Sequence, residues 1–525
     1  MPPFVNREHE IKIVEEAFED LLSEERLLRT PILDFYGIEG VGKTSLLQQV
    51  VQKCDEKHVP HIWADADQNL FSLEQSIIAQ AIRYENLLSS ASTISEPSVA
   101  HHAKILLERG PLVLLFDSID TTNEGQLVWL EDILSVLIVY NKLFVILSSK
   151  RSIAFEREKS IARKLKPVPV YPLDWVSSEA YLNHFQYQFK PEIRELIFEW
   201  TRGYPLAMNI MVETILKQGL DPTTAQGRNM LINIIVERVT AEGILSKVKR
   251  EEHNWLNKAL KLLSIPRRFN LIIMQKLIEE FEPDLKQGKS LSYLVLLRWI
   301  TQATAVLSWK MDKAGFAIED PIRHLLLEQW RIERPAQFHA INHFLADLNK
   351  NNASGPDRTR YQRDYLYHSA NSVDIQQLSE LLQQSIGQII QHAEEMPDWL
   401  IQFVEEFEQD DELKEALGQH MTVAQHLLYE ALANKMLAAY EQEENEAEKF
   451  RYLLSFFDYV IRDPEIKDIQ AVLKEAILRL LQKEAASFLL KLYDELGQKI
   501  SFKVALGTDF VVLRAIIQSR ISAEG

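Results

Sequence analysis

Residues 37–44 read GIEGVGKT, which places three glycines, a lysine and a threonine within eight positions. The pattern G-x-x-x-x-G-K-[ST] forms a phosphate-binding loop when it stands between a strand and a helix. The apolar run PILDFY precedes it here, and the helical pattern SLLQQV follows, so both flanks are in place. The sequence therefore predicts a site for the phosphates of a nucleotide.

Each residue type in this loop has a chemical task. Glycines let successive backbone N–H groups turn toward phosphate oxygens, and the start of the following helix adds partial positive charge. Lys43 would reach the β- and γ-phosphates, and the Thr44 hydroxyl would bind Mg²⁺. The predicted phosphate-binding set is Gly37, Gly40, Gly42, Lys43, Thr44 and Ser45.

Mg²⁺ beside a nucleotide needs an acidic ligand at the end of a neighbouring strand. The apolar run PLVLLFD ends in Asp117, which is the predicted second metal ligand beside Thr44. Asp120 follows and could polarise an attacking water, although a helix cap or a solvated loop acid fits it equally well. The next apolar run, KLFVILSS, ends before Lys150 and Arg151. A base there could contact a terminal phosphate or be an ordinary surface charge.

Short apolar runs alternate with helical patterns from about residue 31 to residue 175. PILDFY, PHIWADAD, PLVLLFDSID and KLFVILSS have the pattern of strands, which predicts a parallel sheet with helices on both faces. Later strand patterns are confined to a hairpin around Asp312 to Gly315, after three helical patterns, the order of a winged helix. The predicted fold is multidomain, α/β followed by α. It comprises a phosphate-loop domain (1–175), a helical domain (176–248), a winged helix (249–335) and an irregular α-helical array (336–525).

Composition narrows the functional classes. The chain has 525 residues, 46% hydrophobic and 26% charged, which is typical of several globular domains. A single cysteine, Cys54, excludes an intrachain disulfide and a cysteine-rich zinc site. A net charge of -18 argues against general wrapping of nucleic acid. Without a signal peptide or an apolar run of membrane-spanning length, the sequence predicts a cytoplasmic protein with no membrane contact.

Six short motifs together resemble one family. In chain order they are FVNRE (4–8), DSID (117–120), GYPLA (203–207), LSIPRRF (263–269), IEDPIRHLL (318–326) and DYLYH (364–368). Their order and spacing are similar to those of the signal-transduction ATPases with numerous domains, the STAND class, with its NB-ARC and NACHT members. The resemblance covers roughly residues 4–370. The remainder of the chain resembles the family only in its helical pattern.

The resemblance implies roles for particular residues. Arg7 and Pro205 would lie against adenine, and Arg151 would sense the γ-phosphate, with ATP or ADP and Mg²⁺ as cofactors. Members usually carry a histidine that touches the β-phosphate of ADP, but here Glu319 stands in its place, and a carboxylate would repel phosphate. In the family, that histidine contact holds the ADP-bound protein in its closed state. Here the contact is therefore either weakened or made by other residues. The predicted catalytic set is Lys43, Asp117, Asp120 and Arg151.

The expected function is a molecular switch rather than a metabolic catalyst. ATP or ADP would set a closed or an open arrangement through contacts made in one state only. Any hydrolysis is expected to be slow, with Asp120 polarising water. The C-terminal array would bind a protein partner or effector, and open subunits would assemble into a homo-oligomer.

Two other functions fit the same motifs. One is a DNA-associated ATPase of the origin-recognition kind, which also pairs a phosphate loop with a winged helix. Residues 250–334 hold 14 Lys and Arg against 11 Asp and Glu, a balance of +3, which is weak for DNA binding. The other is a scaffold that binds nucleotide without turnover.

Overall fold

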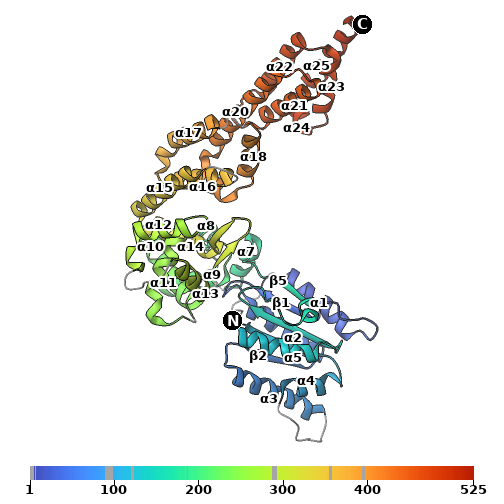
Figure 1. Cartoon of the computed structure of the whole chain (residues 1–525), viewed down its shortest axis with the longest axis vertical. Coiled ribbons are helices and arrows are strands. Elements are labelled where there is room, and N and C mark those ends of the chain that lie inside the picture. Colours follow the sequence, from blue (N-terminus) through green and yellow to red (C-terminus); the bar gives the residue numbers. More distant parts are fainter. Residues whose placement is uncertain are drawn as a thin grey trace. The chain divides into compact units, whose positions relative to one another are not determined.

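The computed structural model describes residues 5, 7–88, 98–119, 123–185, 187–246, 248–286, 293–304, 306–353, 357–392 and 397–524. The chain divides into two compact units, Met1–Pro335 and Ala336–Gly525 (Figure 1). The first unit contains the phosphate loop, and the second is helical in its described residues.

The first unit opens with α1 (Glu8–Leu22) and contains a parallel sheet of order β2-β3-β4-β1-β5. The strands are β1 (Ile32–Tyr36), β2 (His61–Asp65), β3 (Leu112–Ile119), β4 (Leu143–Ser149) and β5 (Leu165–Pro169). The accompanying helices are α2 (Lys43–Glu56), α3 (Leu70–Leu88), α4 (Val99–Leu107), α5 (Glu124–Leu137) and α6 (Lys159–Ala162). The α/β prediction and its four strands are confirmed.

Strand alternation explains why these segments are apolar throughout. On β3, Leu114 belongs to a core packed against α3, α4 and α5. Its neighbours Val113 and Leu115 belong to a second core formed with α1 and α2. Successive side chains of a strand point to opposite faces, so helices on both faces require an almost continuous apolar run (Figure 1).

Two features of the sheet depart from the sequence analysis. β5 was not predicted, because Pro167 and Pro169 interrupt its pattern; it pairs with β1 at the sheet edge, where proline is tolerated. The strand that carries Asp117 is not paired with β1, because β4 lies between them. The acidic strand predicted to lie near the phosphate loop is thus one strand away from β1, and Asp117 still reaches Thr44.

The rest of the first unit is mainly helical. A helical segment contains α7 (Trp175–Asn183), α8 (Pro191–Thr201), α9 (Pro205–Gln218), α10 (Ala225–Arg238) and a π-helical turn, η1 (Val239–Ile244). A helix–hairpin segment follows, with α11 (Arg250–Leu263), α12 (Leu271–Phe281), η2 (Pro283–Lys286), α13 (Tyr293–Thr304), β6 (Leu307–Lys310), β7 (Gly315–Ile318) and α14 (Asp320–Glu333). The antiparallel pairing of β6 with β7 confirms the predicted hairpin.

The second unit is an array of helices. They are α15 (Pro335–Asn352), α16 (Arg358–Ala370), α17 (Ile375–His392), α18 (Pro397–Glu408), α19 (Asp411–Leu417), η4 (Gly418–His420), α20 (Met421–Gln442), α21 (Glu446–Arg462), α22 (Ile469–Lys483), α23 (Ala486–Leu496), α24 (Ile500–Leu506) and α25 (Asp509–Glu524). Their apolar faces meet in one extended core that includes Phe403, Leu428, Phe457 and Leu489. Within the residues described, no helix has the length and apolar character needed to cross a membrane.

Candidate functional site

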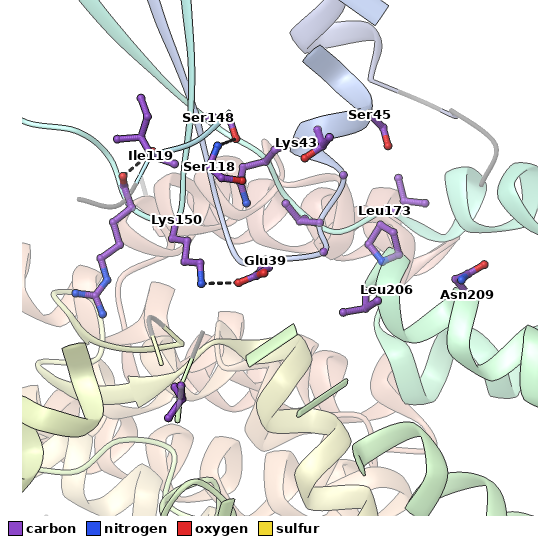
Figure 2. Close-up of a pocket in the computed structure, with 18 of the residues that line it drawn as sticks. Glu39, Lys43, Ser45, Ser118, Ile119, Ser148, Lys150, Leu173, Leu206 and Asn209 are labelled. Atoms are coloured by element: carbon purple, nitrogen blue, oxygen red, sulfur yellow. Dashed lines mark hydrogen bonds and ion pairs between the residues drawn. The ribbon is translucent and has the colours of Figure 1, made fainter. Parts of the chain in front are cut away.

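A cavity of about 740 Å³ lies in the first unit, at the carboxyl ends of β3 and β4 and beside the phosphate loop. Ligands of open parallel sheets bind at this edge, and the volume falls in the range of small-molecule sites. The helical and helix–hairpin segments complete its wall (Figure 2). The charged lining residues are the basic Arg7, Lys43, Lys150, Arg151 and Lys249 and the acidic Glu39 and Glu252. The excess of basic groups favours an anionic ligand.

The phosphate loop connects β1 to α2, which begins at Lys43. Gly40 and Gly42 have φ values of +79° and +107°, a left-handed conformation that favours glycine. A Cβ at Gly40 would lie 2.7 Å from the Cβ of Leu206 on α9. The loop is therefore packed closely against the helical segment, which the local motif alone did not show.

Lys43 is held by the loop itself. Its Nζ donates to the carbonyl oxygens of Gly37 at 2.8 Å and Ile38 at 2.9 Å. Burial lowers the pKa of Lys43 to about 8, although the nearby Glu39 and Asp117 favour its protonated form. A phosphate would provide the strong anionic partner that this buried ammonium lacks among the loop carbonyls.

Thr44 and Asp117 come together as predicted for a metal site. The Thr44 hydroxyl donates to Asp117 Oδ2 at 2.9 Å, and the Ser148 hydroxyl donates to Oδ1 at 2.8 Å. Hydroxyl and carboxylate oxygens are ligands that suit Mg²⁺. The described residues include no cluster of three or more His, Cys, Asp or Glu side chains suited to a metal. The site therefore fits Mg²⁺ only if phosphate and water supply the remaining ligands, as is usual for this ion.

A second buried carboxylate positions the end of β4. Asp34, in the middle of β1, accepts hydrogen bonds from the Ser149 hydroxyl at 2.6 Å and from the Ile153 N–H at 2.8 Å. Burial raises the pKa of Asp34 to about 6. Asp34 was not among the predicted site residues, although an acid inside an apolar strand is a visible signal in the sequence.

The two basic residues after β4 take different partners. Arg151 Nη2 donates to the carbonyl oxygens of Thr301 at 2.8 Å and Leu307 at 3.1 Å. Lys150 forms an ion pair with Glu39 in the phosphate loop (Figure 2). Arg151, the expected phosphate sensor, thus contacts the helix–hairpin segment, and Lys150 contacts the phosphate loop.

Arg7 and Pro205 both line the cavity, as do the glycines Gly40 and Gly42. The Arg7 guanidinium donates to the carbonyl oxygens of Val41 at 2.8 Å and Tyr171 at 2.7 Å. Burial lowers the pKa of Arg7, and its ion pair with Glu10 opposes that shift. Pro205 occupies the first turn of α9. Arg7 therefore clamps the phosphate loop to the segment that follows β5.

Tyr181 and Asn209 are further polar residues of the cavity wall that the sequence did not predict. Tyr181 is 2% exposed, and its hydroxyl has no hydrogen-bond partner among the described residues. Burial raises its pKa to about 12. Asn209 lies four residues after Pro205 on α9 (Figure 2). Neither residue belongs to a motif, so the sequence offered no signal for them.

Two further predictions concern residues away from this wall. Glu319 accepts from Lys310 Nζ at 2.6 Å and from Ser308 at 3.3 Å, and it is not among the residues that line the cavity. Its carboxylate is thus neutralised on the hairpin. Asp120 lies outside the described residues.

The parallel sheet, with the glycine-rich loop between β1 and α2 and Asp117 on β3, defines a phosphate-loop NTPase domain followed by helical domains. No family model matches the sequence, and no curated protein matches it.

Solved structures do show similarity. One is a STAND protein with a tetratricopeptide repeat sensor from Pyrococcus horikoshii, at 13% identity and a TM-score of 0.30, covering 99% of this chain and 72% of that one. Another is the Aeropyrum pernix Orc1 protein in complex with DNA, at 13% identity and a TM-score of 0.34, covering 62% and 94%. A third is Cdc6p from Pyrobaculum aerophilum, at 14% identity and a TM-score of 0.34, covering 63% and 97%. Similarity at this level leaves the function to be inferred from the residues of the site.

Proposed function

We propose that this chain is an ATP- and ADP-binding switch of the STAND type that requires Mg²⁺ and hydrolyses ATP slowly. The observation that carries the proposal is one cavity in which Lys43, Thr44 and the Asp117 strand meet residues of α9, α11 and α13. A ligand in this cavity touches the α/β domain and both later segments. The number of phosphates on the nucleotide can therefore bias how the α/β domain and the two later segments are arranged.

Each residue has a part in binding. Lys43 would exchange two loop carbonyls for phosphate oxygens, which stabilises its protonated form. Thr44 and Asp117 would hold Mg²⁺, which supplies charge neutralisation between the phosphates. Ser148 fixes the rotation of the Asp117 carboxylate through its hydrogen bond to Oδ1. These contacts position a nucleotide before any hydrolysis.

The partner proposal rests on the second unit. Its last two helices expose apolar side chains, with Ile500 79%, Val504 74% and Val511 72% exposed. Ile500 and Val504 are one turn apart on α24 and so share a helix face. We infer that a protein partner, or a second subunit, binds this unit. Measuring the mass of the full chain in ATP and in ADP separates the two cases.

Asp117→Asn tests the metal part of the proposal. Wild-type protein is expected to bind ATP with Mg²⁺ about tenfold or more tightly than ATP with EDTA. The variant should lose most of that difference, because an amide is a weaker Mg²⁺ ligand than a carboxylate. Isothermal titration calorimetry in both buffers measures the ratio. Ser148→Ala, which keeps the carboxylate, should retain most of the Mg²⁺ dependence. Absence of ATP binding to the wild type would overturn the proposed function.

Tyr181→Phe tests whether the buried hydroxyl serves the ligand. Because that hydroxyl has no partner among the described residues, its removal should leave the free energy of unfolding unchanged or slightly higher. Nucleotide affinity should fall roughly three- to tenfold if the hydroxyl bonds to the ligand. Thermal melting and calorimetry give the two readouts.

Tyr493→Phe is the matched control. The Tyr493 hydroxyl donates to the Phe510 carbonyl at 2.7 Å in the second unit. Its loss should lower the free energy of unfolding by about 1 kcal/mol without changing nucleotide affinity. If Tyr181→Phe behaves like this control, its hydroxyl does not contact the ligand.

A further inference from the structure

Glu39, the third residue of the phosphate loop, connects three parts of the first unit. One carboxylate oxygen is ion-paired with Lys150 at the end of β4, and the other accepts from the Ser246 hydroxyl at 3.0 Å. The Glu39 carbonyl oxygen accepts from the Tyr204 hydroxyl, at the start of α9. A residue that the phosphate-loop pattern leaves unspecified thus joins the loop to β4 and to the helical segment.

Lys150 differs from two other basic groups of the cavity in its partner. Lys43 is bonded to loop carbonyls, and Arg151 is bonded to carbonyls of the helix–hairpin segment. Lys150 is instead ion-paired with the carboxylate of Glu39 (Figure 2). A carboxylate partner can be replaced by a phosphate of like charge and similar geometry.

Replacing the Glu39 carboxylate at Lys150 by a phosphate is unfavourable for a nucleoside triphosphate. A third phosphate directed at Lys150 would meet the Glu39 carboxylate, and like charges in close contact are unfavourable. Either Glu39 remains and disfavours the added phosphate, or it leaves Lys150 and disturbs its bond to Ser246. A diphosphate adds no charge at this position and leaves all three contacts intact.

Resting on the proposed function, we infer that Glu39 is a specificity-determining residue that makes this site favour a nucleoside diphosphate over a triphosphate. The γ-phosphate displaces Glu39 from Lys150, and the displacement releases Ser246 from the phosphate loop. The contacts of Glu39 with Lys150 and Ser246 would therefore stabilise the diphosphate-bound arrangement. Glu319 takes no part in this, because it is paired with Lys310 and does not line the cavity.

Glu39→Gln is the test, because glutamine keeps the shape and can still accept from Ser246 while losing the charge. The ratio of the dissociation constants for MgATP and MgADP is expected to fall roughly tenfold, mainly through tighter MgATP binding. Glu15→Gln is the matched control. It removes the same charge from an ion pair with Lys53 outside the cavity wall, so its ratio should stay within about twofold of wild type. Lys150→Gln should weaken MgATP but not MgADP.

Hydrogen exchange of residues 239–246 gives a readout independent of affinity. In wild-type protein these amides should exchange faster with MgATP than with MgADP, because the Ser246 contact is released. In Glu39→Gln the difference should shrink. If wild type binds both nucleotides but Glu39→Gln leaves the ratio unchanged, or Glu15→Gln shifts it equally, the inference is wrong and the proposed function stands. If wild type binds neither nucleotide, both are wrong.

Discussion

Lys43→Ala is expected to weaken ATP and ADP binding at least about a hundredfold. Its ammonium would make charge-assisted hydrogen bonds to phosphate, each contributing about 1.5–3 kcal/mol. The folded protein should remain stable without Lys43. Burial lowers the pKa of this side chain to about 8, which shows that its charged form is costly to bury, and alanine removes that cost. Calorimetry with each nucleotide and thermal melting without nucleotide measure the two effects.

Lys53→Ala is the control for charge on the same helix. Lys53 lies on α2 and pairs with Glu15 through a half-exposed contact at 2.7 Å, so its loss should leave nucleotide affinity unchanged.

Proton uptake on nucleotide binding is a second signature, and it belongs to Lys43 alone. At pH 8 about half of its side chains are unprotonated, so binding should take up roughly half a proton in wild type and none in the variant. Wild-type affinity in Lys43→Ala would overturn the assignment of the phosphate loop.

Gly203→Ala is expected to lower the free energy of unfolding by about 3 kcal/mol or more. Gly203 has a φ of +70°, and a Cβ there would lie 1.7 Å from the carbonyl oxygen of Leu173. Leu173 N–H also donates to the Gly203 carbonyl at 2.9 Å, so the two backbones cannot separate without losing that bond. The change therefore combines backbone strain with a steric clash. Urea unfolding followed by circular dichroism measures it.

Gly219→Ala separates these two contributions. Gly219 ends α9 with a φ of +64°, and a Cβ there would meet no atom within 4 Å. Its substitution should cost only the left-handed conformation, about 1–2 kcal/mol. Equal losses in the two variants would show that the contact between Gly203 and Leu173 contributes little to stability.

The sequence determined the features that depend on local order. The spacing of Gly37, Lys43 and Thr44, with an apolar strand before and a helix after, was sufficient to predict the phosphate loop. Alternating apolar runs predicted four strands of the sheet and the β6–β7 hairpin. Asp117 was found because the apolar run ends in it, although β3 itself continues to Ile119.

Only the tertiary structure decided how those elements meet. The insertion of β4 between β1 and β3 is a long-range pairing that no local pattern encodes. It places Lys150 beside the loop and directs Arg151 elsewhere, although the two are adjacent in sequence. Glu39 gains its significance from Ser246, a partner far along the chain. Tyr181 gains it from a buried hydroxyl that has no hydrogen-bond partner in the part of the chain that the structure describes. Periodicity reports which face of an element is buried, whereas the identity of the group it faces is set by packing between elements.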